Sequence, residues 1–530
     1  MKSSNSWERF TQWQIPVPSL DFSFDFSRMQ FDEKDLAGLS TKLEAAFTEM
    51  ENLESGSIAN PDEGRQVGHY WLRAPELAPD QTTRNQIENT VNSIRDFSEA
   101  VHGGTVKGAG GSFKNLLVIG IGGSALGPQF VGKALGSFKK DRLRLSFFDN
   151  TDPDGVEATL ESLEGELDRT LAIVISKSGG TKETRNGMLE AARAYKETGL
   201  KFADHAVAIT GEGSKLDLVA KEQGWLKRFP MWDWVGGRTS EMSAVGLLPA
   251  ALQGIDIEAF LLGAKQMDAA TRTPQLDKNP AAMMAALWFL AGKGKGEKNM
   301  VIVPYKDRLE LFSKYLQQLV MESLGKDQDL SGKTVHQGLS VFGNKGSTDK
   351  HAYIQQLRDG RNDFFATFIQ VLKDRNGEDL MVEESVTTGD FLFGFLVGTQ
   401  EALTGSGRES MAITIPEVDA KSVGGLIAVF ERAVGFYAFL VDINAYHQPG
   451  VEAGKKAAGE VIELQGRILS CLEARSPDGL TVAELVTELG KGDAAEIVFR
   501  ICEHLAANRS RVQSNSSGAK PFAARYSIQS

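Results

Sequence analysis

Cysteine is scarce in this chain of 530 residues, which contains only Cys471 and Cys502. Two thiols late in the chain give no disulfide framework, so we expect a reducing compartment. The first ten residues mix polar and charged side chains without an apolar core segment, which argues against a secretory signal. These absences predict a cytoplasmic protein.

Long apolar runs and metal-ligand patterns are also missing. The longest apolar stretch, 424–446, is interrupted by Glu431, Arg432, Asp442 and Asn444, so we expect no membrane span. The seven histidines are scattered without HExxH or paired-ligand spacing, and the sequence therefore predicts no metal site. The net charge of −12 argues against nucleic acid or an anionic membrane as the main partner.

Short apolar runs alternate with helical stretches over most of the chain, which is typical of parallel sheets wrapped by helices. A polar, Pro- and Gly-containing linker region at 271–298 separates two such blocks. We therefore predict an α/β chain with two doubly wound parallel sheets, in residues 113–270 and 299–460. The runs expected to be strands are 116–119, 143–148, 171–175, 206–210, 300–304, 364–372 and 411–415.

The N-terminal segment, residues 1–112, is more polar than these blocks. Its helical periodicity at 36–47 and 81–101 predicts a mainly helical segment packed over a larger domain.

The tail, residues 461–530, predicts a small winged-helix-like module. Its first helical pattern covers 468–474, a second begins at the capping box at 480–484, and a third covers 493–507. Two short strand patterns follow the third helix. A separate helix is expected at 455–465. Acidic and basic residues are balanced in the tail, which favours a packing or interaction module over DNA binding.

The loop at 176–184 joins a predicted buried strand to a predicted helix. Backbone N–H groups and the hydroxyls of Ser176, Ser178 and Thr181 are suited to phosphate oxygens. A capped helix start after a glycine turn is an equally good interpretation of this loop alone.

A second glycine-rich loop, 120–125, matches G-x-G-x-x-A. The expected ribose-binding carboxylate is missing at the usual spacing, because Asp149 comes too late. Two phosphate-type loops on neighbouring strands therefore favour one small phosphorylated ligand over a nicotinamide nucleotide.

Four further residues are candidates for chemistry. Arg238 follows paired glycines and is suited to a phosphate or an oxyanion. Glu322 lies along the edge of a predicted buried helical stripe over 308–326, as a general base would. His351 and Lys455 each join a polar or glycine-rich loop to a helix. Structural ion pairs and solvated side chains are the alternatives for all four.

Five segments together resemble the glucose-6-phosphate isomerase family: 120–128, 176–184, 236–240, 317–326 with His351, and 448–455. The resemblance covers about 115–456 and implies two sugar isomerase domains. It also implies a substrate site built from Gly123, Ser124, Ser176, Lys177, Ser178, Thr181, Gln318 and Gln448, with Glu322 as base, Arg238 beside the enediolate, and His351 and Lys455 for ring opening.

The resemblance further implies reversible conversion of glucose 6-phosphate to fructose 6-phosphate through a cis-enediolate, in glycolysis and gluconeogenesis. It implies no cofactor and a homodimer in which His351 comes from the partner subunit. An enzyme that also accepts mannose 6-phosphate and a non-catalytic sugar-phosphate sensor remain as alternatives. The chain departs from the family pattern at Thr239, Glu241, His447 and Gly179-Gly180, which bears on substrate preference.

Overall fold

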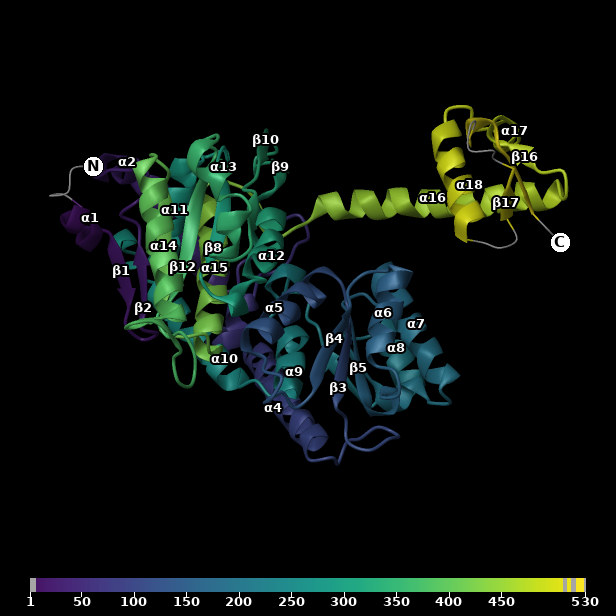
Figure 1. Ribbon diagram of the computed structural model, residues 1–530, viewed down its shortest axis with the longest axis horizontal. Helices are drawn as coiled ribbons and strands as arrows, with labels where there is room; N and C mark the ends of the chain where they lie inside the picture. The colour runs from purple at the N-terminus through teal and green to yellow at the C-terminus, as the bar shows by residue number, and fades with distance from the viewer. Residues whose placement is uncertain (1–5, 509–511, 516–520, 529–530) are drawn as a thin grey trace. The chain divides into compact units, whose positions relative to one another are not determined.

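The computed structural model describes residues 6–508, 512–515 and 521–528 (Figure 1). The fold contains two compact units, Met1–His447 and Gln448–Ser530. The predicted domain boundary at 461 lies within the second unit.

The first sheet of unit 1 is fully parallel, in the order β4-β3-β5-β6-β7. All four predicted strands are present. The fifth, β7, was not expected, because it is a short edge strand with exposed Lys227 and Arg228 in place of an apolar run. The strands are β3 (Asn115–Ile119), β4 (Arg144–Phe148), β5 (Thr170–Ser176), β6 (Ala206–Thr210) and β7 (Lys227–Pro230).

Helices cover both faces of this sheet (Figure 1). Along β5, Leu171 and Ile173 belong to one core cluster and Ala172 and Val174 to another, because alternate side chains point to opposite faces. One face packs under α6 (Pro153–Ser162), α7 (Lys182–Glu197) and α8 (Lys215–Glu222), and the other under α4 (Gln81–His102), α5 (Leu126–Leu135) and α9 (Ala244–Gln253).

The second sheet has the order β1-β2-β15-β12-β8-β11. Its four parallel strands include the three predicted ones, and β1 and β2 form an antiparallel hairpin at its edge. The N-terminal segment is therefore not simply helical. These strands are β1 (Gln14–Val17), β2 (Phe22–Asp25), β8 (Asn299–Pro304), β11 (Val341–Gly343), β12 (Phe364–Val371) and β15 (Ser410–Ile415).

The hairpin escaped prediction because each strand has only four residues and one contains Pro16. Its pairing is nevertheless regular, with Phe24 opposite Ile413 of β15. The other N-terminal elements are helical: α1 (Ser6–Gln12), α2 (Glu33–Ala37) and α3 (Ser40–Glu54).

Helices also lie on both faces of the second sheet. One face is covered by α13 (Ile354–Asp359) and α14 (Thr388–Gly405), and the other by α10 (Ile257–Thr271), α11 (Pro280–Ala291) and α15 (Ala420–Leu440). The predicted linker region contains α11, in which every residue from Pro280 to Trp288 is buried. One core cluster contains residues of both sheets. Two small hairpins complete the unit: β9 (Lys326–Gln328) with β10 (Thr334–Gln337), and β13 (Met381–Glu383) with β14 (Val386–Thr387).

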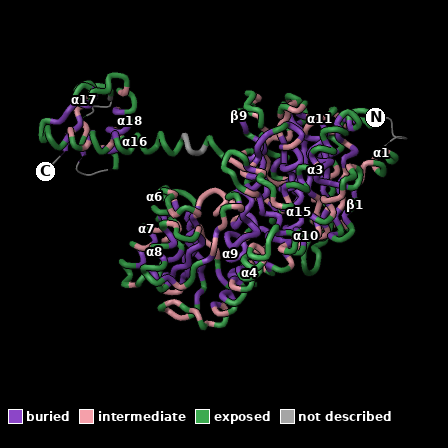
Figure 2. Tube along the Cα trace, turned by 180° about the vertical axis from the view of Figure 1, so that it is seen from behind, coloured by how far each residue is buried: buried purple, intermediate pink, exposed green. Residues whose placement is uncertain are grey.

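Helix α15 is buried in the part of unit 1 that contains the second sheet (Figure 2). By length and composition it is the one helix among the described residues that could cross a membrane, but 94% of its apolar window is buried inside the protein. Glu431 and Arg432, two charged residues within this helix, are buried as well. Burial inside the protein accounts for its apolar composition.

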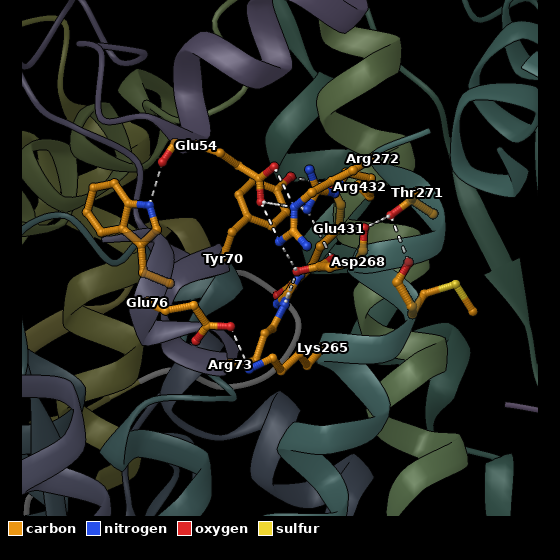
Figure 3. Close-up of polar contacts among 12 residues, drawn as sticks. Glu54, Tyr70, Arg73, Glu76, Lys265, Asp268, Thr271, Arg272, Glu431 and Arg432 are labelled. Atoms are coloured by element: carbon orange, nitrogen blue, oxygen red, sulfur yellow. Dashed lines mark hydrogen bonds and ion pairs between the residues drawn. The ribbon is translucent and has the colours of Figure 1, made fainter. Parts of the chain in front are cut away.

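Those two residues belong to a buried ion network that joins four segments (Figure 3). Arg73 binds Asp268 at 2.6 Å and also pairs with Glu431. Arg432 binds Asp268 at 3.2 Å and Glu54 at 2.9 Å. The network therefore connects α3, the segment before α4, α10 and α15.

Among its described residues, unit 2 has three α-helices and a three-stranded sheet in the order β16-β18-β17. The helices expected at 455–465 and 468–474 form one continuous helix, α16 (Pro449–Ala474), because the single Gly466 between them lowers helix propensity but does not end the helix. The capping box is confirmed, with Thr481 bonded to Glu484. Its other elements are β16 (Leu480–Thr481), α17 (Val482–Leu489), α18 (Ala495–Asn508), β17 (Val512–Ser514) and β18 (Arg525–Ile528); the predicted strand residue Arg511 lies outside the described residues.

The substitution Asp268→Asn should destabilise the protein strongly, because it leaves Arg73 and Arg432 buried without their shared carboxylate. We expect a loss of about 3–5 kcal/mol, measured by urea unfolding followed by tryptophan fluorescence. The control Glu258→Gln breaks an exposed ion pair with Arg95 and should cost at most about 1 kcal/mol. Equal losses in the two variants would contradict a special role for the buried network.

Candidate active site

The first glycine loop lies directly against the loop that carries Arg238. A Cβ atom on Gly123 would lie 1.9 Å from the carbonyl oxygen of Gly237, so only glycine permits this approach. Gly122 has a left-handed backbone, and a Cβ there would lie 3.1 Å from Nε2 of Gln318. The structure thus brings the predicted residues Gly123, Gln318 and Arg238 together, with Ser124 following in the same turn.

The predicted phosphate loop runs from the end of β5 to the start of α7. The Ser176 hydroxyl donates to Oγ1 of Thr181 at 3.4 Å, and the Gly180 N–H donates to Oγ of Ser178 at 3.1 Å. Thr181 occupies the N-cap position of α7 but makes no side-chain capping bond. The alternative of a side-chain-capped helix start therefore does not describe this loop.

Gly179 is required by a close backbone contact. Its φ is +64°, and a Cβ atom would lie 2.3 Å from the backbone nitrogen of Leu216 at the start of α8. The departure from the family pattern at this position therefore reflects packing of the loop against α8.

Lys177 connects the phosphate loop to the segment before Arg238. Its ammonium donates to the carbonyl oxygens of Asp233 and Val235 at 3.0 and 3.1 Å. It also lies 3.5 Å from the Asp233 carboxylate. Burial lowers the pKa of Lys177, and Asp233 opposes that effect. A cation is thereby held at the base of the phosphate loop.

Arg238 and Glu322 form the centre of the site. Nε of Arg238 lies 3.5 Å from Oε2 of Glu322, and the two side chains are 5% and 20% exposed. The guanidinium also donates to the carbonyl oxygens of Ala445 at 2.9 Å and His447 at 3.3 Å. Burial lowers the pKa of Arg238, while Glu322 raises it. A carboxylate and a nearly buried cation therefore face one another, as base-catalysed proton transfer with an oxyanion requires.

The helix that carries Glu322 is less regular than predicted. It consists of α12 (Phe312–Leu316), followed by a wide π-helical stretch, η9 (Gln317–Glu322). The predicted end at Lys326 is wrong, because Lys326 begins β9. Glu322 nevertheless lies at the border of the buried stripe formed by Leu319 and Val320. Such π-helical turns are frequent at functional sites.

The other three predicted site residues are carried by different elements. His351 ends the turn η10 (Thr348–His351) and is exposed. Gln448 and Lys455 belong to unit 2, at the N-cap and in the first turns of α16. Their roles remain predictions.

Two neighbours of the site did not emerge from the sequence. Lys326 is 5% exposed beside Arg238, and Ser323 Oγ accepts from Arg238 at 3.4 Å. Glu241, one of the departures from the family pattern, is also buried, and burial raises the pKa of its carboxyl group well above the usual value.

Two α/β sheets with a hydroxyl- and glycine-rich loop after a parallel strand, and a largely buried guanidinium facing a carboxylate, are typical of the class of enzymes that act on small phosphorylated substrates. Comparison with known proteins is more specific. A family model described as phosphoglucose isomerase matches residues 25–404 and 397–468. The chain belongs to the phosphoglucose isomerase family and is an aldose–ketose isomerase.

Proteins with similar sequences match this chain over nearly their whole length. The chain is 57% identical to proteins named glucose-6-phosphate isomerase from Synechococcus elongatus, over 97% of both chains, and from Geobacter sulfurreducens, over 96% of both chains. A crystal structure of a glucose-6-phosphate isomerase from Chlamydia trachomatis is similar with a TM-score of 0.79 at 27% identity, covering 88% of this chain and 92% of that one.

The substitution Gly123→Ala should disrupt the approach of the first loop to Arg238, since its methyl group would overlap the Gly237 carbonyl. We expect kcat/KM for glucose 6-phosphate to fall about 100-fold, the scale associated with misplacement by about 1 Å. The matched control is Gly237→Ala, whose Cβ would meet no atom within 4 Å. A similar loss in both variants would contradict this account of Gly123.

Proposed function

We propose that this isomerase interconverts glucose 6-phosphate and fructose 6-phosphate with Glu322 as the base that moves a proton between C2 and C1. The observation that carries the proposal is the pairing of Glu322 with Arg238, in a chain whose relatives bear that enzyme's name over nearly full length. These relatives do not favour the non-catalytic sensor or the mannose-accepting enzyme. The reaction belongs to glycolysis and gluconeogenesis.

The reaction begins with the sugar phosphate anchored by its phosphate. Ser176, Lys177, Ser178 and Thr181 form the loop proposed to hold this group, with Gly123, Ser124, Gln318 and Gln448 as further substrate contacts. Binding energy from the phosphate positions the reacting carbons. Lys455 and His351 then assist opening of the sugar ring.

Proton transfer follows ring opening. Glu322 removes the proton beside the carbonyl, and the developing enediolate oxygen is stabilised by Arg238. Returning the proton to the neighbouring carbon, while the hydroxyl proton passes from O2 to O1, completes the isomerisation and restores the carboxylate. The carboxylate and the guanidinium supply this chemistry, and the proposed reaction uses no cofactor or metal.

The substitution Glu322→Gln should remove the base while retaining the shape of the side chain. We expect kcat to fall by about 10²–10⁴-fold, measured by coupling fructose 6-phosphate formation to a dye-linked assay. A phosphorylated, non-reacting sugar analogue should still bind with nearly unchanged affinity in calorimetry, because the phosphate loop is untouched. The control is Glu222→Gln, which changes an exposed glutamate in the same way. Near-normal turnover by Glu322→Gln would exclude Glu322 as the base.

The active assembly is proposed to be a homodimer with His351 supplied across the interface. A small exposed apolar patch supports this arrangement, formed by Phe391 and Phe395 of α14, whose ring centroids lie 6.2 Å apart. The segment that carries His351 borders the patch, since the Lys350 ammonium lies 4.3 Å from the centre of the Phe395 ring. A second copy that covered the patch would therefore meet His351.

Complementation tests this arrangement. Mixing the inactive variants Glu322→Gln and His351→Ala by refolding should form heterodimers with one intact site, and recover about a quarter of wild-type activity from random pairing in a symmetric dimer. Glu322→Gln mixed with Arg238→Ala is the control. Those two residues lie in one subunit, so this pair should recover no activity. Recovery in the control or its absence in the test mixture would contradict a shared site.

We also propose a cytoplasmic location and no nucleic-acid partner. Both cysteines are free, as a reducing compartment requires. Helix α18, the third helix of the winged-helix-like module, carries Glu496, Arg500 and Glu503 in place of a basic stripe.

A further inference from the structure

Lys326 is a buried lysine next to the reacting carboxylate, and the proposed mechanism gives it no role. Only 5% of the surface of Lys326 is exposed to solvent. Its Nζ donates to the backbone oxygen of Glu322 at 2.7 Å and to that of His447 at 3.0 Å. The lysine therefore contacts the main chain of the catalytic base itself.

The first contact closes the end of a helix. Carbonyl groups in the last turn of a helix have no partner within it, and the π-helical stretch ends at Glu322. The N–H four residues further on would normally bind this carbonyl, but Lys326 has entered β9. Its side chain reaches back and takes the place of that N–H.

The second contact joins Lys326 to Arg238. The His447 carbonyl oxygen accepts from Lys326 and also from Nη2 of Arg238 at 3.3 Å. Nε of Arg238 in turn lies 3.5 Å from the Glu322 carboxylate. The contacts form a closed ring that runs from the Glu322 backbone through Lys326, His447 and Arg238 to the Glu322 side chain.

We propose that Lys326 is a positioning residue, which holds the main chain of Glu322 against the 445–447 segment so that the carboxylate and Arg238 keep the separation that proton transfer requires. The proposal rests on the proposed role of Glu322. In this proposal Lys326 acts through its hydrogen bonds to two carbonyl groups.

The charged and titratable groups around Lys326 are Arg238, Glu322, Asp62 and His447. Burial, followed by repulsion from Arg238, lowers the pKa of Lys326 to about 7. A neutral amine still has two N–H donors, enough for both carbonyl groups. Positioning by hydrogen bonds therefore operates in either charge state of the lysine.

The substitution Lys326→Met keeps the length of the side chain and removes both bonds. We expect kcat for glucose 6-phosphate to fall about 10–100-fold, with KM changed less than about 3-fold, because the base is displaced and the phosphate loop is not. Lys326→Gln, which retains two N–H donors, should recover part of the loss. A kcat of Lys326→Met within about 2-fold of wild type would overturn the proposal.

Lys42→Met is the matched control. Lys42 also donates to a carbonyl at a helix end, that of Leu440 in α15, at 3.0 Å, and its loss should leave kcat unchanged. Hydrogen exchange provides a readout independent of activity. The backbone amides at 317–325 should exchange faster in Lys326→Met than in the wild-type protein, and by a smaller factor in Lys326→Gln. If Lys326→Met folds poorly, the comparison of Lys326→Gln with the wild type still tests the contact. Unchanged exchange in both would overturn the proposal.

A pH profile separates positioning from charge. The ratio of wild-type kcat to that of Lys326→Met should stay constant from about pH 6 to 9. If the ammonium charge were the cause, the wild-type advantage would shrink as the lysine lost its proton with rising pH, and that outcome would overturn the hydrogen-bond account. Absence of isomerase activity in the wild-type protein would instead refute the proposed function, whereas the exchange measurement would still test the contact.

Discussion

The buried ion network of Arg73, Asp268, Glu431 and Arg432 is the interaction on which unit 1 most depends. These side chains are almost completely excluded from solvent, so each charge must find its partner inside the protein. Removing water from charged groups costs several kcal/mol per ion, which the pairing roughly offsets. The network consequently contributes less to net stability than to selecting one arrangement, because any other packing of α10 against α15 would leave a buried charge unpaired.

The buried ion network also fixes the candidate active site, because both are connected to α15. Tyr70 donates to the Glu431 carbonyl at 3.3 Å, and the chain after α15 leads to the Ala445 and His447 carbonyl groups that bind Arg238. The position of the guanidinium is therefore set by backbone that α15 anchors. Electrostatic stabilisation of an enediolate depends on a cation already in place, and the backbone after α15 holds Arg238, the cation proposed for that role.

Sequence patterns predicted the elements whose formation depends on neighbouring residues in the chain. Buried parallel strands are continuous apolar runs, so the predicted strands in both sheets were found. The β1–β2 hairpin was missed because its pairing with β15 joins segments far apart in the chain. The same limit applies to the site: the residues Glu322 and Arg238 were identifiable, but the π-helical turn and the buried Lys326 arise from tertiary packing. The roles of His351, Gln448 and Lys455 rest on the family resemblance.

The separation between Arg238 and Glu322 is itself informative. A charge-assisted hydrogen bond between such groups is usually about 2.7–2.9 Å long, and Arg–carboxylate pairs are often bidentate, whereas Nε and Oε2 here lie 3.5 Å apart. The carbonyl groups of Ala445 and His447 hold the guanidinium in this position. A tight bidentate pair would stabilise the carboxylate and weaken it as a base. In the proposed mechanism, binding of Arg238 by neutral carbonyl groups keeps the cation near the developing oxyanion without neutralising Glu322, the proposed base.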